Sequence, residues 1–154
     1  MVISYRSGTV ALTHNGNLIN ASGLRKELEE DGAIFQTTID TEVIANLIAR
    51  NADDGIIKSI KKTMGRIRGS YAMTIMTKDK LIGVRDPHGI RPLVLGQINE
   101  SYVLASETAA LDAIDAEYLR DIKPGEIVEI TENGLKSYMD RPAEKSALCI
   151  FEYV

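Results

Sequence analysis

Two short stretches of the chain hold the side chains best suited to chemistry, one at Asn15 and Gly16 and the other at Asp40. The Asn15 side-chain amide and the Gly16 backbone N–H, which no Cβ obstructs, are two donors that can point at one oxygen atom. Such a pair stabilises the oxyanion of a tetrahedral acyl-transfer intermediate. The Asp40 carboxylate can bind the ammonium group of a substrate. The pattern indicates an acyl-transfer site, although no nucleophile stands beside these residues.

Both stretches also have an ordinary structural interpretation. An Asn-Gly pair after a buried strand is typical of a tight turn, because glycine adopts positive φ angles and asparagine tolerates them. Asp40 precedes a helical pattern, where aspartate is a favoured N-cap residue. A carboxylate at the lip of a cleft can cap a helix and bind a substrate, so the structural and functional interpretations both stay open.

The elements that must position these residues change type near the middle of the chain. Apolar residues recur at helical spacing as far as residue 67 and alternate with period two from Ser70 onward. The first part predicts a strand over residues 9–13 that ends at an Asn15-Gly16 turn, a helix capped by Asn20 or Ser22 with Leu24 and Leu28 on one face, a helix capped by Asp40 that buries Val43, Ile44, Leu47 and Ile48, and a third helix over about residues 54–67. The second part predicts a hairpin of residues 71–77 and 81–85, strands at 92–95 and 102–105, a brief helix at 107–114, a hairpin of 126–130 and 135–138, and a strand at 146–154. Helices early and sheet late indicate one α+β domain.

Composition excludes several classes of protein. A net charge of −4 argues against nucleic-acid binding, which depends on clustered Lys and Arg, and the short apolar runs argue against a membrane span. The single cysteine, Cys149, excludes an internal disulfide framework and fits a reducing compartment. The first six residues lack the features of a secretion signal. We therefore expect a globular cytoplasmic protein.

Several runs of residues, taken together, carry a family resemblance. They are HNGNLINASGLRKELEEDGAIFQTTIDTEVIANLI, GSYAMTIMTKDKLIGVRDPHGIRPLVLG, YVLASETAALD, EYLRDIKPGEIVEI and CIFEYV. Together they resemble the glutaminase domain of the amidophosphoribosyltransferase family, from about Gly8 to Val154. The HNG run and the later Asp-Thr-Glu are shared by the wider class II glutamine amidotransferases, whereas RDPHGIRPL and Pro-Gly-Glu are similar to the purine-pathway member in particular.

The resemblance implies a fold, a reaction and a set of site residues. The fold is that of the N-terminal-nucleophile hydrolases, with layers of helices on antiparallel sheets. The Asn15 side chain and the Gly16 N–H would form the oxyanion hole, Gly16 would also approach the substrate, and Asp40 would hold the α-amino group of glutamine. In the family, a thiolate attacks the glutamine amide, the thioester is hydrolysed to glutamate, and ammonia reacts with phosphoribosyl pyrophosphate to give 5-phosphoribosylamine, the first step of purine synthesis.

The start of the chain departs from this family pattern. The family's nucleophile is an N-terminal cysteine whose own α-amine acts as base, but residue 1 is Met. The Arg that clamps the substrate carboxylate is also absent, because Arg6 stands directly before the first expected strand and not in the family's context. Only eight residues precede that strand, and the last one runs to Val154 without a stop signal. We therefore expect a partial glutaminase domain over residues 1–154, incomplete at the N-terminus, lacking the phosphoribosyltransferase domain and inactive alone.

Metal or cofactor binding has little support in the sequence. Cys149 carries no free α-amine and is interpreted as a buried core thiol, with an iron–sulfur ligand in the parent enzyme as the alternative. His14 and His88 are too few for a metal site. We expect no cofactor in this chain, whereas the parent would use Mg²⁺ and, in some members, an iron–sulfur cluster. Asp86 and Arg91 are expected to form an ion pair that fixes their loop.

Two other functions stay open beside the leading one. A class II amidotransferase of the hexosamine or asparagine-forming type shares the HNG and Asp elements, although RDPHGIRPL argues against it. A non-catalytic glutamine-binding module would fit the missing cysteine. The expected partners are glutamine and the remainder of the parent polypeptide. Missing edge strands would expose unpaired backbone, so we also expect a homo-oligomer.

Overall fold

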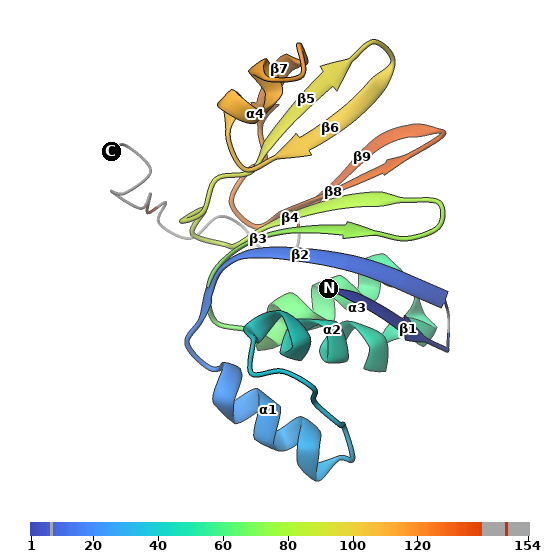
Figure 1. The fold of residues 1–154 in the computed structure, drawn as a ribbon, viewed down its shortest axis with the longest axis vertical. Helices are drawn as coiled ribbons and strands as arrows, with labels where there is room; N and C mark the ends of the chain where they lie inside the picture. The colour runs from blue at the N-terminus through green and yellow to red at the C-terminus, as the bar shows by residue number, and fades with distance from the viewer. Residues whose placement is uncertain (7, 140–146, 148–154) are drawn as a thin grey trace.

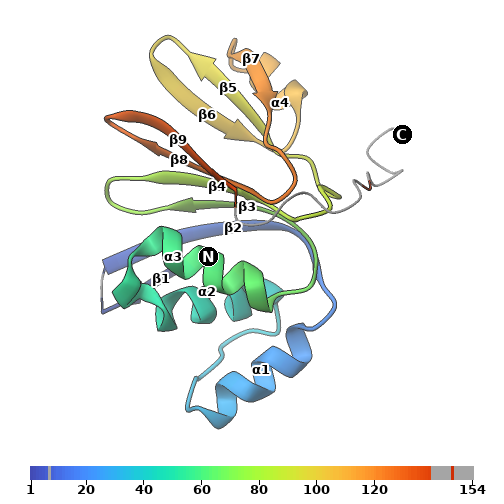
Figure 2. The same ribbon diagram turned by 180° about the vertical axis from the view of Figure 1, so that it is seen from behind.

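The fold consists of four layers, in the order helices, sheet, sheet, helix (Figures 1 and 2). It is seen in a computed structural model, which describes residues 1–6, 8–139 and 147. The elements are β1 (Val2–Tyr5), β2 (Gly8–Leu18), α1 (Ala21–Glu30), α2 (Asp40–Arg50), the 3₁₀ turn η1 (Ala52–Asp54), α3 (Ile56–Arg66), β3 (Gly69–Met76), β4 (Leu81–Arg85), β5 (Val94–Ile98), β6 (Ser101–Ala105), α4 (Thr108–Asp112), β7 (Glu117–Asp121), β8 (Glu126–Thr131) and β9 (Gly134–Met139).

The strands form two antiparallel sheets. A six-stranded sheet has the order β1-β2-β3-β4-β8-β9, and a three-stranded sheet has the order β6-β5-β7. Helices α1 to α3 lie at one end of the molecule, and α4 lies with the small sheet at the other (Figure 1). The expected α+β class, with helices layered on antiparallel sheets, is confirmed.

Three apolar clusters hold the layers together. The largest lies between the helices and the six-stranded sheet, where Leu28 and Ile44 from helices pack with Leu12 and Ile75 from strands. A second cluster, which includes Leu95 and residues of β8, fills the space between the sheets, and a third lies under α4. Period-two alternation explains why one strand serves two layers, because successive side chains point to opposite faces.

Most of the expected elements agree with the structure. All four apolar residues assigned to the α2 face are buried, and so are Leu24 and Leu28 of α1. Both hairpins, β3–β4 and β8–β9, have the expected partners. Strands β1 and β7 were not predicted from the sequence pattern, and the expected strand at 146–154 lies outside the described residues apart from residue 147.

The expected turn at Asn15-Gly16 is wrong. Strand β2 continues to Leu18, and Asn15 and Gly16 pair with Ala72 and Tyr71 of β3. Gly16 allows β2 and β3 to lie close together here, and the chain does not reverse direction at this point. Strand β3 pairs with β2 continuously from Ala11 to Leu18, so tertiary pairing overrides the local turn preference at Asn15-Gly16.

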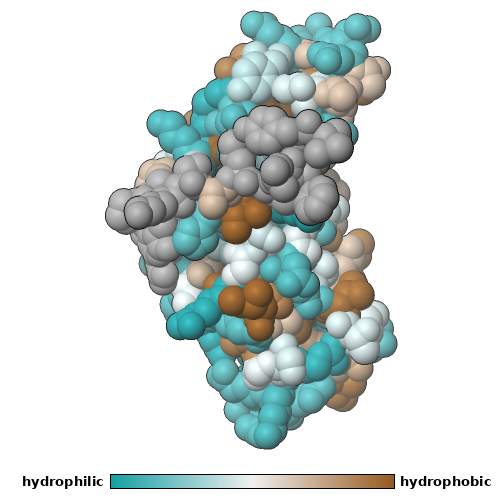
Figure 3. Space-filling model, turned by 90° about the vertical axis from the view of Figure 1, so that its left-hand side faces the viewer, coloured by the Kyte–Doolittle hydropathy of each residue, from teal (hydrophilic) through white to brown (hydrophobic). Residues whose placement is uncertain are grey.

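The surface of the described chain mixes polar and apolar residues. On the coloured part of the face in Figure 3, apolar patches are separated by hydrophilic residues. Among the described residues, no helix is both long enough and apolar enough to cross a membrane.

Candidate functional site

Gly16 lies where β2 and β3 approach too closely to leave room for a side chain. A Cβ built at Gly16 would lie 2.1 Å from the Ser70 carbonyl oxygen, and its φ of +146° is one that L-residues rarely adopt. Gly69 of β3 is under the same constraint from the other strand, because a Cβ there would lie 2.2 Å from the Asn17 carbonyl oxygen. Both glycines are therefore required by this strand pair, whatever else the Gly16 backbone does.

Asn15 lies beside Gly16 with its side chain exposed. It lines a cleft of about 260 Å³ between the two sheets, together with Thr13 and Thr74 of the large sheet and Ser106 after β6. The cleft thus presents an amide and hydroxyl groups to solvent next to the Gly16 backbone. Such donors suit a polar ligand with an amide or carboxylate oxygen.

Asp40 is brought to the end of the same strand. Its Oδ2 accepts a hydrogen bond of 2.8 Å from the Leu18 backbone N–H, two residues beyond Gly16. The expected N-cap role is wrong, because Ile39 is the N-cap and no side-chain cap bond forms. Asp40 instead occupies the first turn of α2, where the helix dipole favours a negative charge. Its side chain is half-buried, between the core and the solvent.

His14 links β2 to the start of α2. Its Nδ1 lies 3.5 Å from the Thr41 hydroxyl, and burial lowers the pKa of the imidazole, an effect that the Asp40 charge and the Ser70 carbonyl oppose. The net pKa is below the ordinary value. A neutral imidazole therefore packs beside the Asp40 carboxylate at neutral pH.

The RDPHGIRPL run forms a loop held by two buried charged residues. The Arg85 guanidinium donates to the backbone carbonyls of Gly89, Arg91 and Ile122 at 2.7 to 2.9 Å. The Asp86 carboxylate accepts from the backbone N–H groups of Tyr71, His88 and Ile90 at 2.9 to 3.3 Å. None of the ion pairs between described residues joins Asp86 to Arg91, so that expectation is wrong. Backbone groups, not a cation, satisfy Asp86, and this anchors the part of β3 that faces Gly16.

Glu42 is a buried carboxylate that the sequence interpretation missed. It accepts hydrogen bonds from the backbone N–H groups of Gln36 and Thr37 at 2.7 and 2.8 Å. Burial alone would raise the pKa of Glu42, but these bonds and the nearby Arg25 hold it below its usual range. The available signal was its place three residues after the N-cap, where glutamate reaches back in a capping box.

Two further buried glutamates tie strands together. Glu126, in the Pro-Gly-Glu run, receives two bonds of 2.8 Å from Arg120 and one of 2.6 Å from the Ser137 hydroxyl. Burial would raise its pKa, yet these donors lower it. Glu129 is bonded by Lys80 and Tyr138, and the balance of the same effects lowers its pKa. Both belong to the scaffold because neither lies at the Asn15 cleft.

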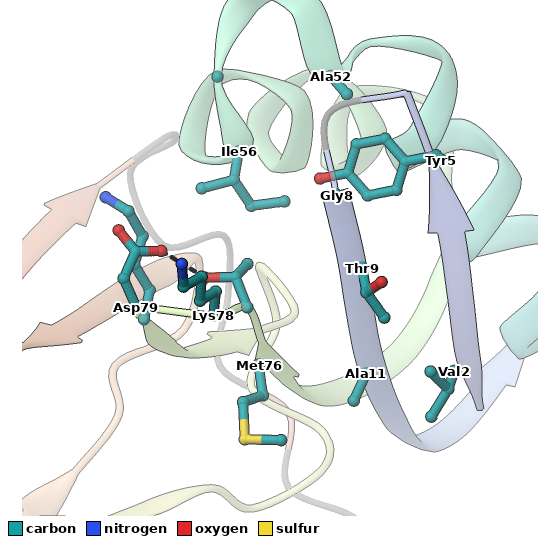
Figure 4. A pocket seen from close by; sticks show the side chains of 13 residues that line it. Val2, Tyr5, Gly8, Thr9, Ala11, Ala52, Ile56, Met76, Lys78 and Asp79 are labelled. Carbon is teal, nitrogen blue, oxygen red and sulfur yellow. Dashed lines mark hydrogen bonds between the residues drawn. The ribbon is translucent and has the colours of Figure 1, made fainter.

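A larger hollow of about 720 Å³ lies away from these residues, between β1 and the β3–β4 turn (Figure 4). Val2, Ala11 and Met76 line its sheet side, and Lys78 and Asp79 approach from the turn. It contains none of the three predicted site residues. Size alone therefore does not mark the functional site.

The described residues contain no group of three or more His, Cys, Asp or Glu side chains that could hold a metal ion. Cys149, the residue considered as a cluster ligand, lies outside the described part of the chain.

Comparison with known proteins identifies the class to which this fold and site belong. Residues 1–113 match the family described as glutamine amidotransferase domain, and the chain belongs to that family. Within it, the chain is 43% identical over 151 residues to amidophosphoribosyltransferase of Bacillus subtilis, covering 98% of this chain and 32% of that protein. It is 45% identical over 154 residues to amidophosphoribosyltransferase 2, chloroplastic, of Arabidopsis thaliana, covering 99% and 28%.

A solved structure shows the same fold. Glutamine phosphoribosylpyrophosphate amidotransferase from B. subtilis, in complex with ADP and GMP, superposes with a TM-score of 0.95 at 42% identity, over 99% of this chain and 34% of that one. A glutamine aminotransferase class-II domain protein from Silicibacter pomeroyi, at 16% identity and a TM-score of 0.66 over 86% of this chain and 67% of that one, shares the fold alone. The chain spans about a third of the length of the amidophosphoribosyltransferases that it matches.

Proposed function

We propose that this chain is the glutamine-binding part of an amidophosphoribosyltransferase, the enzyme that makes 5-phosphoribosylamine from glutamine and phosphoribosyl pyrophosphate. The observation that carries the proposal is the 2.8 Å bond between the Asp40 carboxylate and the Leu18 N–H. This bond ties the Asp40 carboxylate to β2 two residues beyond Gly16 and three beyond Asn15, which supports a shared site at this end of the strand. The identity of 43 to 45% over nearly the whole chain supports this enzyme over the hexosamine and asparagine-forming amidotransferases.

Each of the three residues has one proposed role. The Asn15 side-chain amide and the Gly16 N–H bind the glutamine side-chain oxygen, which becomes an oxyanion when the amide carbon is attacked. Asp40 binds the substrate α-ammonium with the oxygen that Leu18 leaves free. Attack by a cysteine thiolate expels ammonia and forms a thioester, which water then hydrolyses to glutamate. In this proposal the cysteine, its α-amine and the carboxylate clamp belong to the complete enzyme.

The other functions of the complete enzyme are proposed to lie in the remaining two thirds of its length. Phosphoribosyl transfer, with its Mg²⁺, would use the phosphoribosyltransferase domain, and any iron–sulfur cluster would need ligands from there. Cytoplasm is the proposed compartment of this protein, although relatives in A. thaliana are chloroplastic.

Self-association is also part of the proposal. Strand β1 is at the edge of the large sheet, and Val2 on it is 69% exposed. An uncharged edge strand with an exposed apolar side chain favours pairing with another chain. Light scattering at micromolar concentration should give an oligomer, and a monodisperse monomer would contradict this.

Mapping ligand contacts by NMR tests the glutamine site. On adding L-glutamine to ¹⁵N-labelled protein, we expect the signals of the Asn15 side chain and the Gly16 and Leu18 amides to shift in a saturable way. The D40N variant should lose the Leu18 response, whereas D53N, which alters an exposed carboxylate, should keep it. Shifts confined to residues of the larger hollow in Figure 4 would overturn the assignment.

A further inference from the structure

The chain between α1 and α2 determines where Asp40 lies, because it leads directly into the first turn of α2. Its residues from 33 to 39 form no regular helix or strand. Such a segment has many conformations available, and each would start α2 at a different place. Its course therefore has to be fixed by side chains.

Glu42 binds this segment from the helix. Its Oε1 accepts the Gln36 N–H at 2.7 Å, and its Oε2 accepts the Thr37 N–H at 2.8 Å and the Thr37 hydroxyl at 2.6 Å. The Thr37 hydroxyl oxygen in turn lies 3.4 Å from the Ile39 N–H, which donates to it. Glu42 thus acts as an extended capping box, reaching the N-cap residue through the threonine hydroxyl.

Arg25 holds the same segment from α1. Its guanidinium donates to the Thr37 carbonyl, lies 3.9 Å from Glu42 Oε2, and stacks 4.1 Å from the centre of the Phe35 ring. Both the amide and the carbonyl of Thr37 are therefore bound. Thr37 is three residues before Asp40, so this anchor leaves little freedom for the start of α2.

We propose that Glu42 is a positioning residue, which fixes the entry of the chain into α2 and thereby places the Asp40 carboxylate for recognition of the α-ammonium group of glutamine. The ligand part of this inference rests on the proposed function. Glu42 touches no substrate, since its two oxygens are occupied by Gln36 and Thr37.

The test compares E42Q with the matched control E29Q. Glutamine at position 42 keeps one acceptor oxygen and replaces the other with an NH2 group, so it cannot accept from both the Gln36 N–H and the Thr37 donors. Glu29 also pairs with Arg25, at 3.6 Å, so E29Q weakens that ion pair without touching the segment. We expect the Leu18 amide proton to move upfield in E42Q, as its bond to Asp40 lengthens, and to stay unchanged in E29Q.

Binding measurements complete the test. E42Q should bind L-glutamine at least fivefold more weakly, and glutaramic acid, which lacks the α-amine, with unchanged affinity. A general loss of structure would weaken the binding of both ligands. If E42Q is folded and its Leu18 amide is unchanged, the inference is overturned.

A second variant keeps the inference testable if E42Q fails to fold. T37V removes the hydroxyl that donates to Glu42 and accepts from the Ile39 N–H, and it should produce a smaller upfield shift of Leu18. An unchanged Leu18 amide in T37V would overturn the positioning role. If the unaltered protein does not bind L-glutamine, the proposed function fails, whereas the Leu18 shift still decides whether Glu42 positions Asp40.

Discussion

Replacing Gly16 with alanine tests the closest contact of the site in the most direct way. The new Cβ would lie 2.1 Å from the Ser70 carbonyl oxygen and 2.9 Å from the Tyr71 Cα, so β2 and β3 must separate. The φ of +146° adds backbone strain for an L-residue, about 1–3 kcal/mol. Overpacking against backbone that cannot rotate away costs about 1–3 kcal/mol more. The total, roughly 2–6 kcal/mol, is a large part of the stability of a single domain.

Urea unfolding followed by circular dichroism measures this cost, and G8A is the matched control. Gly8 has a similar φ of +136°, but a Cβ there would meet nothing within 4 Å. G8A should therefore lose only the strain contribution, about 1–3 kcal/mol. We expect G16A to lose at least about 1 kcal/mol more than G8A. Equal losses would refute the contact between Gly16 and Ser70 as the reason for glycine.

Two further predictions concern ionisable groups. E126Q should lose roughly 1.5–3 kcal/mol of unfolding free energy at pH 7, because it removes the charge bonded by Arg120, whereas the exposed E132Q should lose almost nothing. The folded-state pKa of Glu126 lies below its unfolded value of about 4.3, so this stability is present above that pH and is lost as the pH falls. In urea titrations on the acid side, the unfolding free energy of E126Q should therefore fall less steeply with pH. An unaltered slope would contradict the lowered pKa. An NMR titration of the His14 ring should give a pKa below about 6.5, so its protonation also destabilises the fold as the pH falls through that range. D40N removes a charge that raises the pKa of His14 and should lower it further, and a rise in D40N would show that the two groups do not interact.

The sequence predicts well where one periodic pattern dominates. The four apolar residues of α2 follow the spacing of one helix face, and all four are buried. The apolar segments on both sides of the Lys78-Asp79-Lys80 turn pair as the expected β3–β4 hairpin. In these elements local preference and tertiary packing favour the same structure, so the local pattern is sufficient.

Prediction fails where a distant strand decides the structure. The Asn15-Gly16 pair carries a strong turn signal, but β3 pairs with it over residues that lie more than fifty positions away in the sequence. Strand β7 has mostly exposed side chains, so no alternation marks it, and it forms because β5 offers an open edge. A local sequence pattern does not indicate which distant strand will pair with a segment.

The candidate site divides in the same way. Residue types and the family resemblance selected Asn15, Gly16 and Asp40, and the structure places all three at one end of β2. The bond from Leu18 to Asp40 and the anchoring of Thr37 by Glu42 join residues that only the folded chain brings together. A buried carboxylate bonded to backbone amides has no sequence signature beyond its spacing from the helix start.

The most direct test of the glutamine site is a thermodynamic cycle between Asp40 and the substrate α-amine. Dissociation constants are measured by calorimetry for L-glutamine and for glutaramic acid, each with the unaltered protein and with D40N. If Asp40 binds the ammonium group, the unaltered protein prefers L-glutamine by about tenfold, or ~1.4 kcal/mol, and D40N shows no preference. The same preference in both proteins would contradict the assignment of Asp40, and with it the proposed glutamine site.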